Sequence, residues 1–151
     1  MHLAIGQGFV LATPLQVNVA TAFVANGGKI IKPHLLARVA SGDGREIAFE
    51  TPGDSHPLVD PDNLSIVADG MRQACEKGGT GWPFFNAPYA VGCKTGTAEK
   101  AQGNPHAWFT AFAPFESPEI AITVLVEEGG EGSSVAGPVA REILDWWFAR
   151  K

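Results

Sequence analysis

The residues whose types could do chemistry lie in the stretch 92–98, Gly-Cys-Lys-Thr-Gly-Thr-Ala. Lys94 is a cation, and Thr95 and Thr97 place hydroxyls on either side of Gly96. Successive side chains of a β-strand point to opposite faces, so Thr95 and Thr97 share one face and Lys94 and Gly96 share the other. Two hydroxyls on one face can hold an anion, and a glycine inside a strand lets another backbone approach. We therefore predict an anion-binding edge for a visiting peptide.

The tripeptide Lys94-Thr95-Gly96 also has two other interpretations. A phosphate-binding loop places glycine directly before lysine and opens a helix, whereas Cys93 separates Gly92 from Lys94 and β-forming residues follow. This difference disfavours a nucleotide site. The structural alternative is a solvated edge strand, on which a lysine prevents edge-to-edge aggregation. On these three residues alone, the structural and functional interpretations carry equal weight.

Length and composition narrow the class of protein. The chain has 151 residues, enough for one domain with a core. Only 18% of its residues are charged, against 45% that are hydrophobic, which is typical of a piece of a larger domain with an apolar face that the rest would cover. The net charge of −5 without a basic cluster excludes a nucleic-acid partner. No run approaches the ~20 apolar residues that span a bilayer.

The two cysteines, Cys75 and Cys93, do not have metal-type spacing with His34, His56 or His106. We therefore expect neither a metal site nor a cofactor. Free cysteine is among the most buried residue types, so both are expected to be buried thiols, with a disulfide as the alternative.

The first half of the chain predicts one helix and one hairpin. Thr13-Pro14-Leu15-Gln16 supplies an N-cap, a proline at the first helical position and the glutamine of a capping box. The helix is expected to run to about Asn26, to be largely buried and to end in a left-handed glycine cap. Segment 29–49 predicts a hairpin that turns at 41–44, and 51–60 predicts a loop.

An amphipathic helix and an aromatic loop are predicted next. Asp60-Pro61 begins the helix and Gly78-Gly79 ends it. Its expected apolar face consists of Leu64, Val67, Ala68, Met71, Ala74 and Cys75. Trp82, Phe84 and Phe85 in the loop 80–89 either flank a substrate path or form a local hydrophobic plug.

The last third predicts an antiparallel meander and a closing helix. Strands at 89–98, 107–113 and 120–126 are joined by short turns. A helix at 135–148 would be capped by Ser133 or Ser134. It would pack on the sheet through Ala136, Val139, Ala140, Ile143 and Trp147. His106 is interpreted as a surface group at a strand end, and Glu127, Glu128 and Glu131 as a solvated loop.

Several short segments occur in a specific order along almost the whole chain. They are Ala4-Ile5-Gly6-Gln7-Gly8, Thr13-Pro14-Leu15-Gln16, Asn26-Gly27-Gly28, Lys32-Pro33-His34-Leu35, Gly79-Thr80, Lys94-Thr95-Gly96-Thr97-Ala98 and Trp108-Phe109-Thr110-Ala111-Phe112-Ala113-Pro114. In this order they resemble the C-terminal half of the transpeptidase domain of class B penicillin-binding proteins, and the elongation-type branch, penicillin-binding protein 2, fits best. The resemblance implies an α+β fold of the β-lactamase/transpeptidase type, with an antiparallel sheet of three to five strands packed by helices that include a C-terminal one.

In that family three motifs build the active site: Ser-x-x-Lys with the nucleophile, Ser-x-Asn, and the Lys-Thr-Gly strand. Here none of the six serines is followed three residues later by lysine, and no Ser-x-Asn occurs. We therefore expect residues 1–151 to be the C-terminal portion of one transpeptidase domain. The portion with the other two motifs is absent from it. The chain alone is expected to be inactive, and poorly stable or self-associating because its sheet would have an open edge.

The resemblance implies a role for each residue of the third motif. Lys94 would place a positive charge beside the nucleophilic hydroxyl and the substrate carboxylate. Thr95 and Thr97 would donate hydroxyls to that carboxylate, and the Thr97 backbone N–H would contribute to the oxyanion hole. Gly96 would leave room for a peptidoglycan stem peptide along the strand.

The resemblance also implies a biological setting. The parent enzyme would be a peptidoglycan D,D-transpeptidase on the periplasmic or extracytoplasmic face of the bacterial inner membrane. Its partners would be stem peptides, β-lactam antibiotics, the missing N-terminal half of the domain, and cell-elongation or division proteins. Two alternatives remain: a non-catalytic binding or assembly module, and a D,D-carboxypeptidase or β-lactamase relative.

Overall fold

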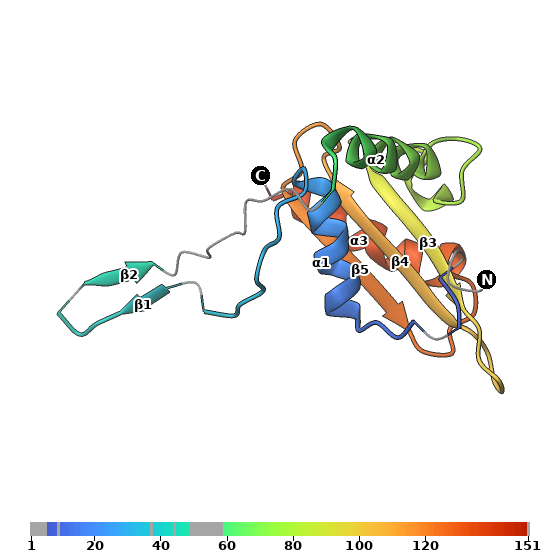
Figure 1. Ribbon diagram of the computed structural model, residues 1–151, viewed down its shortest axis with the longest axis horizontal. Coiled ribbons are helices and arrows are strands. Elements are labelled where there is room, and N and C mark those ends of the chain that lie inside the picture. The colour runs from blue at the N-terminus through green and yellow to red at the C-terminus, as the bar shows by residue number, and fades with distance from the viewer. Residues whose placement is uncertain (1–5, 9, 37, 44, 49–58, 151) are drawn as a thin grey trace.

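The computed structural model describes residues 6–8, 10–36, 38–43, 45–48 and 59–150 (Figure 1). Its elements confirm the predicted α+β class. In chain order they are α1 (Pro14–Ala25), β1 (Arg38–Ala40), β2 (Glu46–Ala48), α2 (Pro61–Cys75), a 3₁₀ turn (Trp82–Phe84), β3 (Gly92–Ala98), β4 (His106–Ala113), β5 (Ile120–Val126), a π-helical turn (Gly132–Ala136) and α3 (Gly137–Phe148).

The central sheet is the predicted antiparallel meander, in the order β3-β4-β5. Lys94 lies opposite Thr110 and Gly96 opposite Trp108, and Thr110 in turn lies opposite Thr123. Helix α1 packs on one face of β4 and β5 and α3 on the other, while α2 lies along β3. Among the described strands, β3 is therefore an edge strand of this sheet.

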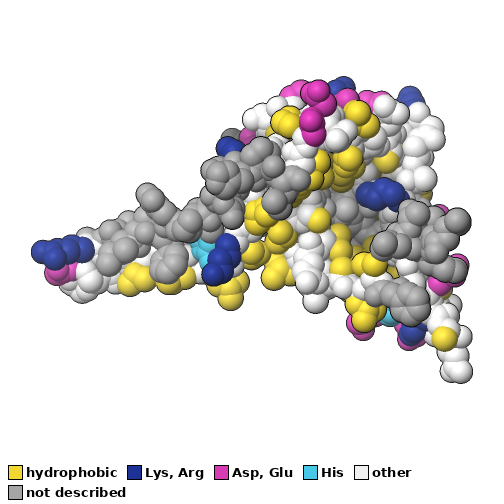
Figure 2. Space-filling model, in the orientation of Figure 1, with side chains coloured by type: hydrophobic (Ala, Val, Ile, Leu, Met, Phe, Trp, Pro, Cys, Tyr) yellow, Lys and Arg dark blue, Asp and Glu magenta, His cyan; other side chains and the backbone are white. Residues whose placement is uncertain are grey.

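Helix α1 begins with the predicted capping box. The Gln16 amide N–H donates to Thr13 Oγ1 at 3.2 Å, and the Thr13 N–H donates to Gln16 Oε1 at 2.8 Å. The expectation that α1 is largely buried is wrong, since Thr21 is its one buried residue. The helix contacts the sheet partly through hydroxyls, with 2.6 Å between Thr21 Oγ1 and Thr110 Oγ1. Hydrophobic side chains remain exposed on the face of the molecule where α1 lies (Figure 2).

The predicted hairpin is confirmed, because β1 and β2 pair antiparallel with Val39 opposite Ile47, but its first strand begins at Arg38 and is shorter than the expected segment from residue 29. It extends away from the body of the molecule (Figure 1). The predicted loop 51–60 lies outside the described residues except for 59 and 60.

Helix α2 begins where predicted, with Asp60 Oδ1 accepting from the Asp62 N–H at 2.9 Å. It ends at Cys75, three residues before the predicted glycine stop. Of its expected apolar face, Leu64 and Cys75 are buried, whereas Val67 is 49% exposed. Within the described residues no helix has the length and apolar character to cross a membrane.

The two cysteines form a disulfide, so the expectation of buried thiols is wrong. Cys75 ends α2 and Cys93 lies near the start of β3, with 5.7 Å between their Cα atoms. The docking of α2 along β3 brings them together across 18 residues. This proximity is tertiary, so the spacing of the cysteines in the sequence carries no sign of it.

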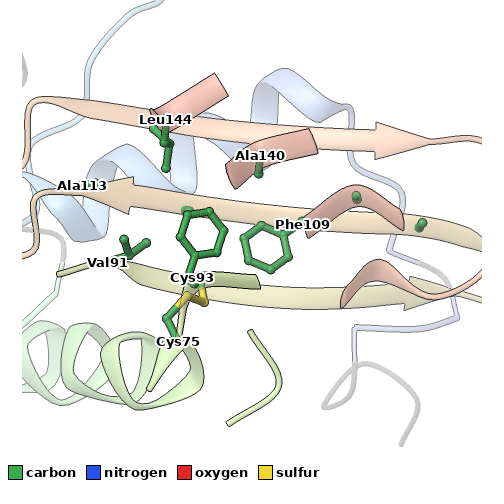
Figure 3. Packing of buried hydrophobic residues seen from close by; sticks show 11 residues of the cluster. Cys75, Val91, Cys93, Phe109, Ala113, Ala140 and Leu144 are labelled. Carbon is green, nitrogen blue, oxygen red and sulfur yellow. A yellow bond between two sulfur atoms is a disulfide. The ribbon is translucent and has the colours of Figure 1, made fainter. Parts of the chain in front are cut away.

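The core lies between the sheet and α3 (Figure 3). Val91, Cys93 and Phe109 converge there with Ala140 and Leu144 of α3. The predicted contact face of α3 is wrong in part. Ala136, Ala140 and Leu144 are fully buried, whereas Val139, Ile143 and Trp147 are 42%, 41% and 37% exposed.

The start of α3 also differs from the prediction. A π-helical turn precedes the helix, and the N-cap residue Ala136 makes no side-chain cap. The hydroxyls of Ser133 and Ser134 instead donate to the Glu131 carboxylate at 3.0 Å each, so the predicted serine cap is wrong. A Cβ added at Gly137 would lie 3.3 Å from the Phe109 ring, so small residues bring this end of the helix close to the sheet.

Candidate functional site

The four residues of the predicted site lie on the edge strand β3. The cross-strand register places Thr95 opposite Phe109 and Thr97 opposite Ala107, both of which are buried in the core on the α3 side. Residues directly opposite each other share a face, so Thr95 and Thr97 lie on the face that bears α3. Lys94 and Gly96 lie on the other face, which confirms the predicted alternation.

The free edge of β3 is defined by two backbone carbonyl groups. The Thr95 carbonyl accepts from Lys94 Nζ at 2.6 Å, and the Thr97 carbonyl accepts from Gln7 Nε2 at 3.0 Å. In an antiparallel pair, residues that face the partner exchange both N–H and C=O with it, and the alternate residues turn both groups away. The N–H of Thr97 therefore points to the free edge. A backbone N–H must point there to donate a hydrogen bond to an anion or to a peptide that pairs with the strand.

Both threonine hydroxyls are engaged by neighbouring loops. Thr95 Oγ1 donates to Thr80 Oγ1 at 3.0 Å, and Thr97 Oγ1 accepts from the Gly132 N–H at 3.5 Å. Lys94 is exposed. The site thus combines a cation, two oriented hydroxyls and outward backbone groups within four residues, which is a donor set suited to a carboxylate and an extended peptide.

The glycine at 96 has close neighbours inside the chain. A Cβ added there would lie 3.0 Å from the Cβ of Trp108. The loop residue Gly132 lies against the same backbone, because a Cβ added at Gly132 would be 2.4 Å from the Gly96 carbonyl oxygen and 2.2 Å from that of Trp108. The space taken by Trp108 is therefore a structural reason for Gly96 beside the predicted substrate-based one, and the close approach to the Gly96 backbone is a reason for the glycine at 132.

His106 and the acidic loop remain structural. His106 begins β4, and its Nδ1 accepts from the Glu128 N–H at 3.0 Å. The Lys100 ammonium pairs with the Glu128 carboxylate and holds its pKa below the usual range. Within the described ranges no group of histidine, cysteine, aspartate and glutamate side chains could hold a metal ion.

In the aromatic loop, Phe84 forms a hydrophobic plug, the second of the two predicted interpretations. Phe84 is buried and stacks on Phe109 with 5.4 Å between ring centroids. Trp82 is 51% exposed. Arg141 of α3 fixes this loop by donating to the Pro83 carbonyl at 2.8 Å.

Sequence reasoning missed three residues that contact the motif strand: Gln7, Thr80 and Gly132. Each is flanked by or belongs to a glycine-rich segment, namely Gly6-Gln7-Gly8, Gly79-Thr80-Gly81 and 129–132. That pattern was the available signal, because glycine permits close approach between backbones. The partner of each segment was not evident from it.

Comparison with known proteins gives the family. A family model described as the penicillin binding protein transpeptidase domain matches residues 1–145. The peptidoglycan D,D-transpeptidase MrdA of Haemophilus influenzae is 36% identical over 177 aligned residues, which cover 100% of this chain and 26% of that protein. The chain spans about a quarter of the length of such curated relatives and matches their C-terminal part.

Solved structures agree with this match. Penicillin-binding protein A from M. tuberculosis, solved as an imipenem acyl-enzyme complex, has a TM-score of 0.80 at 29% identity and covers 95% of this chain and 32% of its own. The penicillin-binding protein PBP2 of Helicobacter pylori, solved with MreC, has a TM-score of 0.79 at 35% identity and covers 98% of this chain and 26% of its own. The resemblance to elongation-type penicillin-binding proteins and the expected fold are thereby confirmed. This chain belongs to the penicillin-binding protein transpeptidase family.

Proposed function

We propose that this chain forms the Lys-Thr-Gly wall of the active site in a peptidoglycan D,D-transpeptidase. The observation that carries the proposal is the edge strand β3, where the Thr97 backbone faces outward beside Lys94 and two hydroxyls. An extended stem peptide can pair with such an edge by strand addition.

The reaction is an acyl transfer in two steps. A serine hydroxyl attacks the carbonyl of the D-Ala-D-Ala bond, the terminal D-alanine leaves with a proton, and an ester to the serine remains. An amine of a neighbouring stem peptide then attacks the ester, forms the cross-link and returns the proton to the serine. A β-lactam acylates the same serine by opening its ring.

Each motif residue has a part in these steps. Lys94 lowers the cost of proton transfer at the serine and attracts the substrate carboxylate. Thr95 and Thr97 donate hydroxyls to that carboxylate. The Thr97 N–H is one oxyanion-hole donor, and losing such a donor costs about 3–4 kcal/mol in the transition state.

The nucleophile has to come from a part of the protein other than these 151 residues. None of the six serines begins a Ser-x-x-Lys sequence. Ser133 and Ser134 follow Gly132, whose N–H contacts Thr97, but their hydroxyls donate to Glu131. We therefore propose that the chain is the C-terminal portion of one transpeptidase domain and is inert alone.

The setting we propose is the extracytoplasmic side of the bacterial inner membrane, where the parent protein is anchored. The Cys75–Cys93 disulfide supports it, because disulfides persist in oxidising compartments such as the periplasm.

A fluorescent penicillin tests the proposal. We expect no covalent band on a denaturing gel from the 151-residue chain, and a band from the transpeptidase that contains it. Lys94→Ala in that transpeptidase should slow acylation about 100-fold or more. Lys32→Ala is the matched control, since Lys32 is also exposed but lies far along the chain from β3. Acylation of the isolated chain, or a normal rate for Lys94→Ala, would refute the proposal.

A second candidate is a non-catalytic assembly role, favoured by exposed hydrophobic side chains such as Leu15, Leu35 and Ile66, at 57%, 106% and 69%. The structure of Helicobacter pylori PBP2 with MreC supports a cell-elongation protein as the partner class. Two results together would favour this role: no penicillin acylates the full protein, and the Lys94→Ala variant binds such a partner with unchanged affinity.

A further inference from the structure

The loop between α2 and β3 places a third hydroxyl beside the two on the motif strand. Thr80 Oγ1 accepts a hydrogen bond from Thr95 Oγ1 at 3.0 Å. Thr80 is exposed and Thr95 is half-buried. The pair is separated by 15 residues in the sequence, so the contact depends on how the loop folds back on β3.

The backbone on both sides of Thr80 is fixed. The Gly79 N–H donates to the Glu76 carbonyl at 2.9 Å, and the Gly81 N–H donates to the Ala74 carbonyl at 2.7 Å. A Cβ added at Gly79 would lie 2.3 Å from the Ala74 carbonyl oxygen. The loop therefore lies directly against the last turn of α2.

The Cys75–Cys93 disulfide links the end of α2, on which this loop packs, to β3. A Cβ added at Gly81 would lie 2.5 Å from the Cys93 sulfur and 2.9 Å from the Cys75 sulfur. Cys93 is fully buried and is the residue before Lys94. Thr80 is thus held against the motif strand by α2, by two glycines and by the disulfide.

We infer that Thr80 is a positioning residue that aims the hydroxyl of Thr95 at the substrate carboxylate. A hydroxyl has one proton to donate, and without an anion Thr95 gives it to Thr80. When a carboxylate binds beside Lys94, the Thr95 proton turns to the anion and Thr80 donates in its turn to Thr95. A chain of hydrogen bonds polarises its members and strengthens the terminal one.

This inference rests on the proposed function and makes a narrower prediction. Thr80 acts on the binding of the carboxylate and not on the chemical step, so its loss should change affinity before acylation and leave the acylation rate constant unaltered. One hydrogen bond of this kind corresponds to a loss of affinity of about 2- to 10-fold.

The test uses the transpeptidase that contains this chain. Stopped-flow acylation by a penicillin separates the dissociation constant of the first complex from the acylation rate constant, for the free carboxylate and for its methyl ester. Thr80→Val should weaken the first complex with the carboxylate about 2- to 10-fold, leave the ester and the acylation rate constant unchanged, and be rescued by Thr80→Ser. Ser117→Ala, at an exposed serine in the turn after β4, is the control.

The possible outcomes distinguish the role of Thr80 from the proposed function. Three results would overturn the role of Thr80 while the proposed function stands. They are an equal loss of affinity for the carboxylate and the ester, a change in the acylation rate constant alone, and no rescue by Thr80→Ser. A wild-type protein that no penicillin acylates would overturn both. Unfolding midpoints of the variants within error of wild type exclude a folding defect, and Thr95→Val with Thr80→Val completes a double-mutant cycle.

Discussion

Gly132 lies against Gly96 so closely that a Cβ on Gly132 would be 2.4 Å from the Gly96 carbonyl oxygen. Its N–H also points to Thr97 Oγ1 at 3.5 Å. The glycine-rich loop before α3 is therefore part of the wall that contains the motif strand. It connects the start of α3 with the residues to which we assign substrate binding.

Gly132→Ala should push this loop away from β3. The added Cβ meets backbone atoms, which cannot rotate away, so we expect a loss of about 1–3 kcal/mol in the free energy of unfolding together with slower acylation of the full transpeptidase. Gly70→Ala is the matched control, because Gly70 lies in α2 with no atom within 4 Å of an added Cβ. That variant should gain about 0.4–1 kcal/mol. Urea unfolding measures both, and equal effects of the two substitutions would contradict the close approach.

The disulfide should stabilise the protein by closing a loop between residues 18 apart. A loop of this length corresponds to about 3 kcal/mol of unfolding free energy, which the double variant Cys75→Ala, Cys93→Ala should lose. Dithiothreitol should destabilise the wild type by a similar amount and leave the double variant unchanged. Two reactive thiols in the unreduced, denatured wild-type protein would contradict the pairing.

Thr97→Pro tests the backbone donor on the free edge. Proline lacks the N–H and is tolerated on an edge strand where that group faces away from the partner. Thr97→Ala removes the hydroxyl and the γ-methyl group, keeps the backbone N–H, and is the control. We expect Thr97→Pro to be acylated about 100- to 1000-fold more slowly than Thr97→Ala, the effect of one oxyanion-hole donor. Equal second-order acylation constants would assign the oxyanion donor elsewhere.

Local sequence signals predicted the helices and strands of this fold. Tertiary contacts determine how those elements are oriented against one another. The capping box at Thr13 and Gln16 specifies its helix by hydrogen bonds within one turn, so the start of α1 was predictable. The face that α3 turns to the sheet was not, because it depends on tertiary packing such as the close contact between Gly137 and Phe109. Alternating side chains predicted the two faces of β3 for the same local reason as the capping box.

The neighbours of the motif strand show the same limit. Lys94, Thr95 and Thr97 were identified by type and spacing, and their roles in catalysis stay predictions. Gln7 reaches Thr97 across 90 residues, and Thr80 reaches Thr95 across 15. Such contacts depend on how loops close over the sheet. The glycines beside these residues indicate a close approach but do not identify the segment that is approached.

Tyr89 gives a prediction of pH dependence. Its hydroxyl donates to Asp145 Oδ1 at 2.6 Å, and Arg141 Nε donates to Asp145 Oδ2 at 2.7 Å. Burial and the hydrogen bond to Asp145 raise the pKa of Tyr89 above its usual value. The folded state therefore holds the phenol proton more tightly than the unfolded state, so this contribution to stability is fully present below a pH of about 10, the unfolded pKa, and is lost as the pH rises beyond it.

Tyr89→Phe removes both the hydrogen bond and this pH dependence. We expect it to lower the free energy of unfolding by about 1–2 kcal/mol at pH 8, which is toward the low end for a hydrogen bond to a charged group because Asp145 is partly exposed. The difference between wild type and variant should shrink between pH 8 and pH 11, because only the wild type loses stability there through the Tyr89 phenol. Urea unfolding across this range measures the difference. A gap that stays constant with pH would show that the Tyr89 proton is held no more tightly in the folded state than in the unfolded state.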